Sequence, residues 1–264
     1  MNFEIPLADS GRLISTNGSY TVWQDDKFYW VQEGTDIQSV MSIDFPAELV
    51  LPTHRLMYVA TELVGRPRSI LNLGFGVGSL ERKLQSDFPN VDCTSVDVSR
   101  ELTEIARQYF FLDNAGTIVI AKAEDYLAAT SQKYDVIFID LFAAGLNASC
   151  LYEGVFYKNL VSSMHEQSVA AINLIPHDEP DLLKILLPLR QYLPQVALAQ
   201  IEGRKNIVLV AGNSLHASLP DQAQARHDKL SESPKQVSWN LTAFTQLPEP
   251  SAQNGKINVD DEAE

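Results

Sequence analysis

The segment 69–98, SILNLGFGVGSLERKLQSDFPNVDCTSVDV, decides the fold of the chain. A short apolar run ends at the glycine-rich turn GFGVG (74–78), an amphipathic segment follows, and a second apolar run ends on Asp97. This order of strand, glycine turn, helix, strand and acid is typical of a βαβ unit that binds a nucleoside. Glycine lets the backbone pass close to a ligand, and an acid about 20 residues further on can accept hydrogen bonds from two ribose hydroxyls.

The glycines are spaced G-x-G-x-G, with the third at Gly78, whereas a dinucleotide-binding turn has its third glycine one place later, where this chain has Ser79. The observed spacing is similar to the motif of S-adenosylmethionine-dependent transferases. The alternative is an ordinary glycine-rich turn without a ligand, but the strand before it and the acid after it favour nucleoside binding. The predicted nucleoside contacts in this unit are Gly74, Phe75, Gly76, Gly78, Ser79, Asp97 and Val98.

The composition restricts the class of protein. The 264 residues, of which 45% are hydrophobic, suffice for one large domain or for a main domain with a small appendage. A net charge of −14 would repel a nucleic-acid backbone, so we expect a small-molecule substrate and no nucleic-acid partner. We expect no membrane contact, because no segment reaches 18 consecutive apolar residues, and a cytoplasmic location, because the N-terminus lacks the pattern of a secretory signal.

The two cysteines, Cys93 and Cys150, do not suggest a metal site. Neither belongs to a C-x-x-C motif and no histidine cluster accompanies them, so we expect no metal. Cys93 lies within an apolar run and is expected to be a buried thiol.

Three regions are expected along the chain. Residues 1–45 alternate and turn like short β-strands, with a hairpin signal at Asn17-Gly18, and predict a small N-terminal β domain. Residues 46–213 predict a nucleoside-binding domain in which strands and helices alternate. Residues 214–264 are polar and acidic and predict a partly disordered extension, in which the apolar residues within 239–244 could dock one short piece.

The central region predicts an α/β sheet. Apolar runs predict strands over about 69–73, 91–97, 117–121, 134–140, 168–175, 195–202 and 205–211, and amphipathic segments predict helices over about 47–64, 78–87, 99–111, 124–129, 152–165 and 178–192. Near-continuous apolar strands need helices on both faces of the sheet. The last two strands are joined by Gly203-Arg204, a connection so short that it forces an antiparallel hairpin. The prediction is an α/β, Rossmann-like class I methyltransferase fold: a mostly parallel seven-stranded sheet with a terminal antiparallel hairpin, plus the small N-terminal β domain.

Polar residues at the ends of the predicted strands are the candidates for chemistry, because ligands bind at the carboxyl ends of the strands in an open α/β sheet. Asp97 would hold the ribose. Glu124 or Asp125 could reach an adenine amino group, although both could simply favour the N-terminus of their helix. Asp140 ends the most apolar strand, YDVIFID, and could orient or deprotonate an amine, unless it only caps the following turn. His54 could act as a general base, but with no fixed partner in the sequence a packed or surface histidine is the preferred interpretation.

Four segments together resemble a known family: WVQEGTDIQSVM (30–41), LNLGFGVGS (71–79), SVDV (95–98) and YDVIFIDLF (134–142). Their order is similar to that in the spermidine synthase family of aminopropyltransferases, and more closely to its divergent bacterial spermidine synthase-like branch, over roughly residues 11–212. The resemblance implies a β-stranded N-terminal domain beside a class I methyltransferase fold, and a homodimer. It also implies transfer of aminopropyl from decarboxylated S-adenosylmethionine to putrescine, with release of methylthioadenosine and without a metal.

The resemblance assigns roles to single residues. Gln38 matches the family's glutamine near the nucleoside and the amine, and the three glycines of the turn match its glycine loop. Asp97 matches the ribose-binding acid, and Asp140 matches the catalytic acid that activates the attacking amine. S-adenosylmethionine or its decarboxylated form would then be the bound substrate.

Four positions depart from the family pattern. Where the family has an aspartate in the glycine loop, this chain has Val77, and where the family has an acid after the third strand, it has Lys122. Where the family has a second acid beyond the catalytic one, this chain has Ala143. The family's Tyr-x-Glu region is His54-Arg55-Leu56 here. A dication such as putrescine needs several carboxylates. Two alternatives therefore stay open: an S-adenosylmethionine-dependent methyltransferase acting on a small molecule, and a catalytically inactive nucleoside-binding protein.

Overall fold

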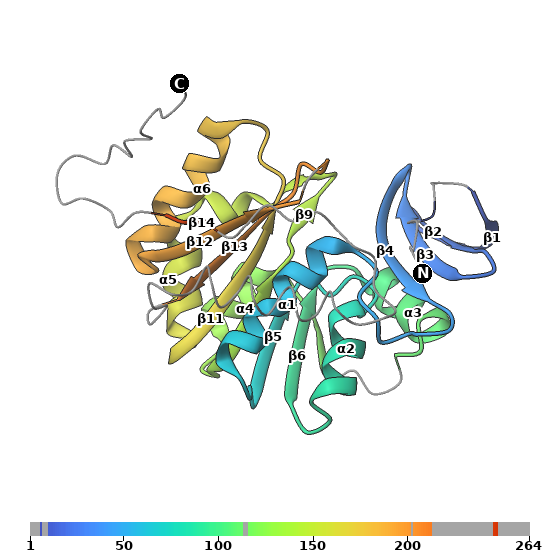
Figure 1. Cartoon of the computed structure of the whole chain (residues 1–264), viewed down its shortest axis with the longest axis horizontal. Coiled ribbons are helices and arrows are strands. Elements are labelled where there is room, and N and C mark those ends of the chain that lie inside the picture. Colours follow the sequence, from blue (N-terminus) through green and yellow to red (C-terminus); the bar gives the residue numbers. More distant parts are fainter. Residues whose placement is uncertain (1–5, 7–9, 113–115, 202, 213–244, 248–264) are drawn as a thin grey trace.

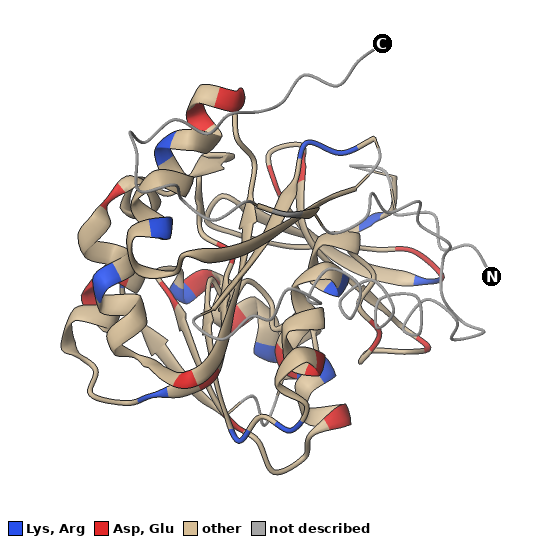
Figure 2. Cartoon of the chain, turned by 60° about the vertical axis from the view of Figure 1, so that its left-hand side comes forward, with Lys and Arg blue, Asp and Glu red and all other residues tan. Residues whose placement is uncertain are grey.

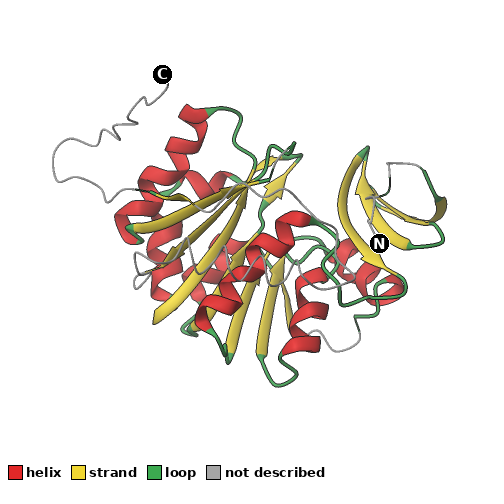
Figure 3. Cartoon of the chain, in the orientation of Figure 1, coloured by secondary structure: helices red, strands yellow, loops and turns green. Residues whose placement is uncertain are grey.

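The computed structural model describes residues 6, 10–112, 116–201, 203–212 and 245–247. Two sheets lie side by side in it: a small antiparallel sheet formed by the N-terminal strands, and a large sheet with helices on both faces (Figures 1 and 3). Charged residues of both signs are spread over many elements rather than gathered on one (Figure 2). No helix within the described ranges is long and apolar enough to cross a membrane.

The N-terminal sheet is a four-stranded meander. Its strands β1 (Arg12–Asn17), β2 (Tyr20–Gln24), β3 (Phe28–Glu33) and β4 (Asp36–Ser42) pair in sequence order, and every pair is antiparallel. The first hairpin turns at Asn17-Gly18, where Gly18 has a φ of +60°, a conformation that glycine adopts without strain. The predicted N-terminal β unit is therefore confirmed.

The large sheet contains the seven predicted strands and one more. The strands are β5 (Ser69–Leu73), β6 (Asp92–Asp97), β7 (Thr117–Ile120), β8 (Tyr134–Ile139), β11 (Met164–Leu174), β12 (Gln195–Gln200), β13 (Ile207–Gly212) and β14 (Thr245–Gln246). Their order across the sheet is β14-β12-β13-β11-β8-β5-β6-β7. Strands β11, β8, β5, β6 and β7 pair in parallel with one another, whereas β12, β13 and β14 join the sheet through antiparallel pairs. The predicted mostly parallel sheet with a terminal antiparallel hairpin is confirmed, and β14 is an addition.

Helices cover both faces of this sheet. They are α1 (Pro52–Val64), α2 (Ser79–Asp87), α3 (Arg100–Tyr109), α4 (Ala123–Ala129), α5 (Gly154–Ser162) and α6 (Glu179–Tyr192), with a 3-10 turn, η1, at Ser149–Tyr152. Alternate residues of β8 face opposite sides: Ile137 and Ile139 pack with α5 and α6, whereas Val136 and Phe138 pack with α1 and α2. Burial on both faces explains why the strands are near-continuous apolar runs.

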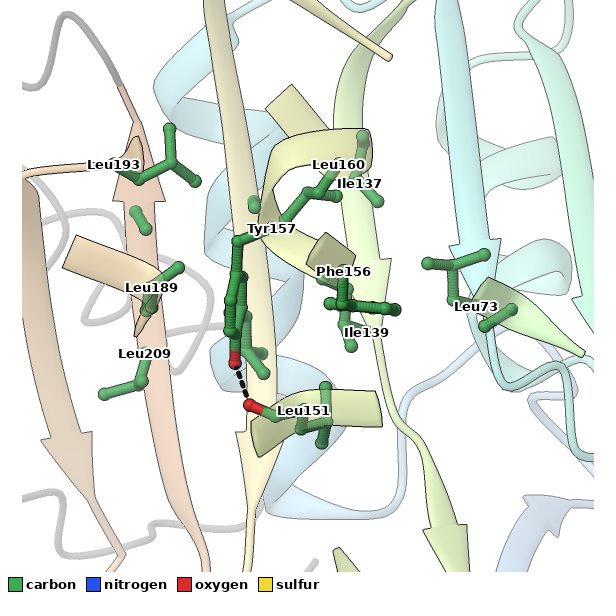
Figure 4. Close-up of a cluster of buried hydrophobic side chains, with 14 of the residues drawn as sticks. Leu73, Ile137, Ile139, Leu151, Phe156, Tyr157, Leu160, Leu189, Leu193 and Leu209 are labelled. Carbon is green, nitrogen blue, oxygen red and sulfur yellow. Dashed lines mark hydrogen bonds between the residues drawn. The ribbon is translucent and has the colours of Figure 1, made fainter. Parts of the chain in front are cut away.

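Figure 4 shows the apolar cluster on the α5 side of the sheet. The rings of Phe156 and Tyr157 meet edge to face with centroids 5.4 Å apart, and both side chains are fully buried. The Tyr157 hydroxyl donates to the backbone oxygen of Leu151 at 2.6 Å, so that its burial leaves no polar group unpaired. Burying a Phe- or Leu-sized side chain stabilises the fold by roughly 1.5–3 kcal/mol. This packing holds β8 and β11, whose ends carry part of the site described below.

A third apolar cluster joins the two sheets, and we call it the seam. Val22 and Met41 of the N-terminal sheet pack there with Phe75 and Val77 of the glycine turn and with Phe110, which follows α3. All five side chains are at most 3% exposed. The seam therefore fixes the N-terminal sheet against the glycine turn.

The start of β11 differs from the prediction. The helix predicted over 152–165 ends at Ser162, and the strand predicted from 168 begins at Met164, which pairs with Tyr134. The reason is the polar stretch HEQS (165–168), which carries three exposed residues and so lacks the apolar pattern of a strand.

Other boundaries also shift. The helix predicted over 47–64 begins at Pro52, since proline has no N–H to donate and fits the first turn of a helix. A short hairpin that the sequence did not predict, β9 (Phe142–Ala143) with β10 (Leu146–Asn147), follows β8. Cys93 is 6% exposed, as predicted for a buried thiol, and the predicted docking piece at 239–244 lies outside the described residues.

Candidate active site

A cavity of about 780 Å³ lies between the N-terminal sheet and the carboxyl ends of the central strands, a volume within the usual range for small-molecule sites. The chain runs outward from β5 to β6 and β7 and returns to β8 on the other side of β5. The ends of β5 and β8 therefore form the switch point at which an open α/β sheet binds its ligands. The lining includes Gly74, Gly76, Asp97, Asp140 and Asn173 from the large sheet, and Asp36 and Gln38 from the small one.

The glycines of the turn serve different purposes. Gly74 has a φ of +95°, and a Cβ there would collide with the backbone oxygen of Asp140, so this glycine lets β5 and β8 lie close together. Gly76 has a φ of +56°, and a Cβ there would meet no atom within 4 Å, so the backbone is open on that side. Gly78 precedes α2 with a φ of +74° and packs against Leu112. Of the three, Gly76 is the one that leaves room for a ligand.

Asp97, at the end of β6, is held by the backbone. Its Oδ2 accepts a hydrogen bond from the Gly76 amide at 3.0 Å, and its Oδ1 accepts one from the Ser99 amide at 2.8 Å. Burial raises the pKa of this carboxyl, and the backbone hydrogen bonds partly oppose that rise. An ionised carboxylate has about four acceptor positions. The amides of Phe75 and Val98 also stabilise the charged form. Because Asp97 lines the cavity, its carboxylate is placed to accept from hydroxyl donors such as those of a ribose.

Asp140 follows β8 and is the centre of a side-chain network. Its Oδ2 lies 3.2 Å from Nε2 of His54, and its Oδ1 accepts a hydrogen bond from Nδ2 of Asn173 at 2.8 Å. The Asn173 Oδ1 accepts in turn from Nδ2 of Asn206 at 3.0 Å. His54 comes from the first turn of α1, Asn173 from β11, and Asn206 from the residues just before β13. All four residues line the cavity.

The sequence predicts neither Asn173 nor Asn206 as a site residue, and it offers His54 as a general base only as the less favoured interpretation. His54 was interpreted as a packed or surface histidine because its partner, Asp140, is 86 positions away. The signal for Asn173 is a polar residue inside the apolar run AAINLI, where a buried amide needs partners. No comparable signal marks Asn206.

Most of the predicted site residues lie together. The cavity is lined by Gln38, Gly74, Phe75, Gly76, Asp97, Val98 and Asp140, but not by Gly78, Ser79, Glu124 or Asp125. Ser79 instead binds the hydroxyl of Ser39 at 2.9 Å and the guanidinium of Arg82 at 3.3 Å, contacts that tie α2 to β4.

The predicted adenine contacts beyond β7 lie in the first turn of a helix and outside the cavity lining. Glu124 and Asp125 occupy the first turn of α4, where negative charge is favourable. The neighbouring Ala121 and Ala123 line the cavity in their place. A contact between either acid and a ligand stays a prediction.

Of the positions that depart from the family pattern, only His54 lines the cavity. Val77 and Leu56 are 1% and 0% exposed and belong to the core, while Lys122 and Ala143 are exposed. Val77, Leu56, Lys122 and Ala143 are not in the cavity lining. The cations that do line it are Arg204 and Lys205, on the connection between β12 and β13.

Comparisons with known proteins place the chain among transferases of two kinds. No protein-family model matches the sequence. The chain is 28% identical over 206 residues to the polyamine aminopropyltransferase of Neisseria meningitidis serogroup A, a match that covers 75% of this chain and 78% of the relative. It is similar to the crystal structure of a probable spermidine synthase from Corynebacterium glutamicum, with a TM-score of 0.74 and 15% identity over 85% of this chain and 86% of that one.

The second kind is a methyltransferase. The chain is similar to human methyltransferase-like protein 13 in complex with SAH, with a TM-score of 0.56 and 25% identity over 67% of this chain and 88% of that one. The prediction of a transferase agrees with both kinds of relative. The predicted resemblance is confirmed: the chain is similar in sequence to polyamine aminopropyltransferases and has the class I methyltransferase fold of the spermidine synthases.

Proposed function

We propose that the chain is a transferase that binds S-adenosylmethionine or its decarboxylated form, and that it transfers aminopropyl from the latter to a polyamine-type amine. The observation that carries this proposal is the composition of one cavity. Gly76 and Asp97 of the nucleoside-binding unit line one part of it, and Asp140 with its partners lines another. The similarity to a polyamine aminopropyltransferase supports the type of reaction.

In this proposal the nucleoside lies over the glycine turn. Asp97, which lines the cavity, accepts hydrogen bonds from the ribose hydroxyls, and Gly76 leaves room for the ligand. Gln38 of β4 lines the cavity from the N-terminal sheet. The nucleoside is thus held by Asp97, whose carboxylate is itself fixed by backbone amides, and its reacting carbon lies beside Asp140.

The transfer step needs a neutral nitrogen. The network of Asp140 removes a proton from the acceptor ammonium, and the nitrogen then attacks the methylene carbon next to the sulfonium. The carbon–sulfur bond breaks, its electron pair stays on sulfur, and methylthioadenosine leaves. Holding the amine in line with the leaving sulfur supplies much of the rate, because it converts a bimolecular step into an effectively unimolecular one.

Methyl transfer to a small molecule is the second candidate. The similarity to a methyltransferase in complex with SAH favours it, as does the position of Val77, which is buried in the seam instead of offering an acid to a diamine. The same nucleoside site and the same proton acceptor would serve this reaction.

The inactive alternative is the weakest of the three. It would be favoured by a cavity filled by Phe75 or blocked by Lys122. The side chain of Phe75 is 3% exposed and packs in the seam, and Lys122 does not line the cavity.

The proposal is tested by titration calorimetry with S-adenosylmethionine, its decarboxylated form and methylthioadenosine. Each donor that binds is then incubated with a panel of diamines and monoamines, and the nucleoside product is identified. Preference for the decarboxylated donor with release of methylthioadenosine is the expected result. Release of S-adenosylhomocysteine would select the methyltransferase, and binding without any release would select the inactive alternative.

A further inference from the structure

A directed chain of hydrogen bonds crosses the cavity at the end of β8. The Asn206 amide donates to Oδ1 of Asn173, and the Asn173 amide nitrogen faces Asp140. That nitrogen donates to Oδ1 of Asp140, and Oδ2 of Asp140 faces Nε2 of His54. The direction of these bonds is fixed at Asp140: an ionised carboxylate can only accept, so the Asn173 nitrogen faces it and the Asn173 oxygen accepts from Asn206.

This direction selects one form of His54. A carboxylate oxygen 3.2 Å from Nε2 requires the proton to be on Nε2. In the neutral ring the lone pair then lies on Nδ1. His54 is 9% exposed and lines the cavity together with Asp140, so the ring is held at the place where the acceptor must bind.

We propose that His54 is the catalytic proton acceptor and that Asp140 is the positioning residue that fixes its tautomer. The inference rests on the proposed function and applies equally to aminopropyl and methyl transfer. An imidazole is a stronger base than a carboxylate by about two pKa units in ordinary peptides, and is therefore better matched to an alkylammonium.

The proton balance of the step is simple. The acceptor ammonium gives one proton to Nδ1 of His54, whose imidazolium is stabilised by the carboxylate of Asp140. The neutral amine then attacks the carbon of the sulfonium, the carbon–sulfur bond breaks, and the electron pair stays on sulfur. The product leaves as an ammonium ion that carries the positive charge formerly on sulfur, and His54 then releases its own proton to water.

The sharpest test is Asp140→Asn. Because the Asn173 amide nitrogen faces the Oδ1 position, the new side chain keeps its oxygen there and turns its amide nitrogen toward His54. That nitrogen donates to Nε2, which forces the ring proton onto Nδ1 and removes the lone pair that would take the proton. The same change at the aspartate of a serine-protease triad lowers kcat by about 10⁴-fold for this reason.

Nitrogen-15 NMR of labelled histidine reads this change without any acceptor. We expect the proton of His54 on Nε2 in the wild type and on Nδ1 in Asp140→Asn. The exposed His165, on β11, serves as the reference signal whose tautomer does not respond. An unchanged His54 tautomer in Asp140→Asn would overturn the positioning role.

The catalytic role is tested with His54→Gln against the matched control His165→Gln. We expect His54→Gln to lower kcat by roughly 10²–10⁴-fold and to abolish the acidic limb of the pH–rate profile, while methylthioadenosine affinity is kept. We expect the control to behave like the wild type. Near-normal kcat in His54→Gln overturns the inference alone, whereas a wild type that transfers no group to any amine overturns the proposed function and the catalytic role with it.

Discussion

The two halves of the cavity are built in different ways. The nucleoside half comes from one continuous βαβ unit, in which the amides of Gly76 and Ser99 hold the carboxylate of Asp97. The acceptor half comes from four separate elements, and its side chains hold one another through the chain from Asn206 to His54. The first half is fixed by local backbone geometry, and the second by tertiary contacts. Binding and chemistry should therefore fail separately when each half is damaged.

The largest expected effect is on chemistry alone. Asp140→Asn should lower kcat by on the order of 10³–10⁴-fold, because the replacement amide leaves His54 in the wrong tautomer. The affinity for methylthioadenosine should stay within about threefold, since the backbone holds Asp97 independently of this network. Steady-state kinetics measures kcat, and calorimetry on the same sample measures the affinity for methylthioadenosine. Full activity in this variant would remove Asp140 from the mechanism.

The next largest effect is on binding alone. Asp97→Ala should weaken methylthioadenosine binding by at least ~100-fold, because two hydrogen bonds to a charged group contribute about 1.5–3 kcal/mol each. Asp92→Ala, at the exposed start of the same strand, is the matched control. Calorimetry measures both, and equal affinities in the two variants would contradict the assignment of the pocket.

A buried glutamate beneath the nucleoside half makes the stability of the protein depend on pH. Glu81 of α2 is 1% exposed beneath β5 and β6, where its Oε1 accepts from Asn72 at 2.7 Å and from Ser95 at 2.5 Å. Burial raises its pKa in the folded protein. Its contribution to stability is therefore complete below the ordinary pKa of a glutamate and is lost as the pH rises through the raised value. The loss is about 1.4 kcal/mol for each pH unit between the two.

Glu81→Gln keeps the two hydrogen bonds and carries no charge. Its free energy of unfolding should equal or exceed that of the wild type at pH 8, and its advantage should shrink as the pH falls toward 5. Urea titrations of both proteins across this range test the expectation, and parallel pH curves would count against it.

The smallest expected effect concerns acceptor choice. Lys205 lines the cavity on the side of Asn206 and should repel the distant ammonium of a diamine. Lys205→Glu should lower the KM for a diamine by about 2–5-fold relative to a monoamine, as expected for one exposed charge pair. Lys158→Glu on α5, exposed and away from the cavity lining, is the control. An equal ratio of diamine KM to monoamine KM in wild type and Lys205→Glu would show that the charge of Lys205 does not affect acceptor binding.

The same contrast explains what the sequence could predict. The nucleoside half could be predicted because glycines, strand and acid follow one another within one segment, and the hairpin of β12 and β13 follows from the short connection at Gly203-Arg204. In the acceptor half Asp140 could be predicted from its place at the end of an apolar strand, but its partners could not, because His54 meets Asp140 across 86 positions and Asn206 meets Asn173 across 33. The β9–β10 hairpin was missed since its turn places a non-glycine residue, Ala144, at a φ of +50°.

The burial of Val77 in the seam has a consequence for engineering and for evolution. An aspartate introduced there would bury a carboxylate among the apolar side chains of Val22, Met41 and Phe110 instead of offering an acid to a substrate. The buried guanidinium of Arg82, which donates to the backbone oxygen of Val77 at 2.7 Å, is the cation beside it. The apolar face of the N-terminal sheet would have to change at the same time. The glycine turn and the N-terminal sheet are therefore packed as one unit, and we expect a graft of either one into a relative to need matching changes in the other.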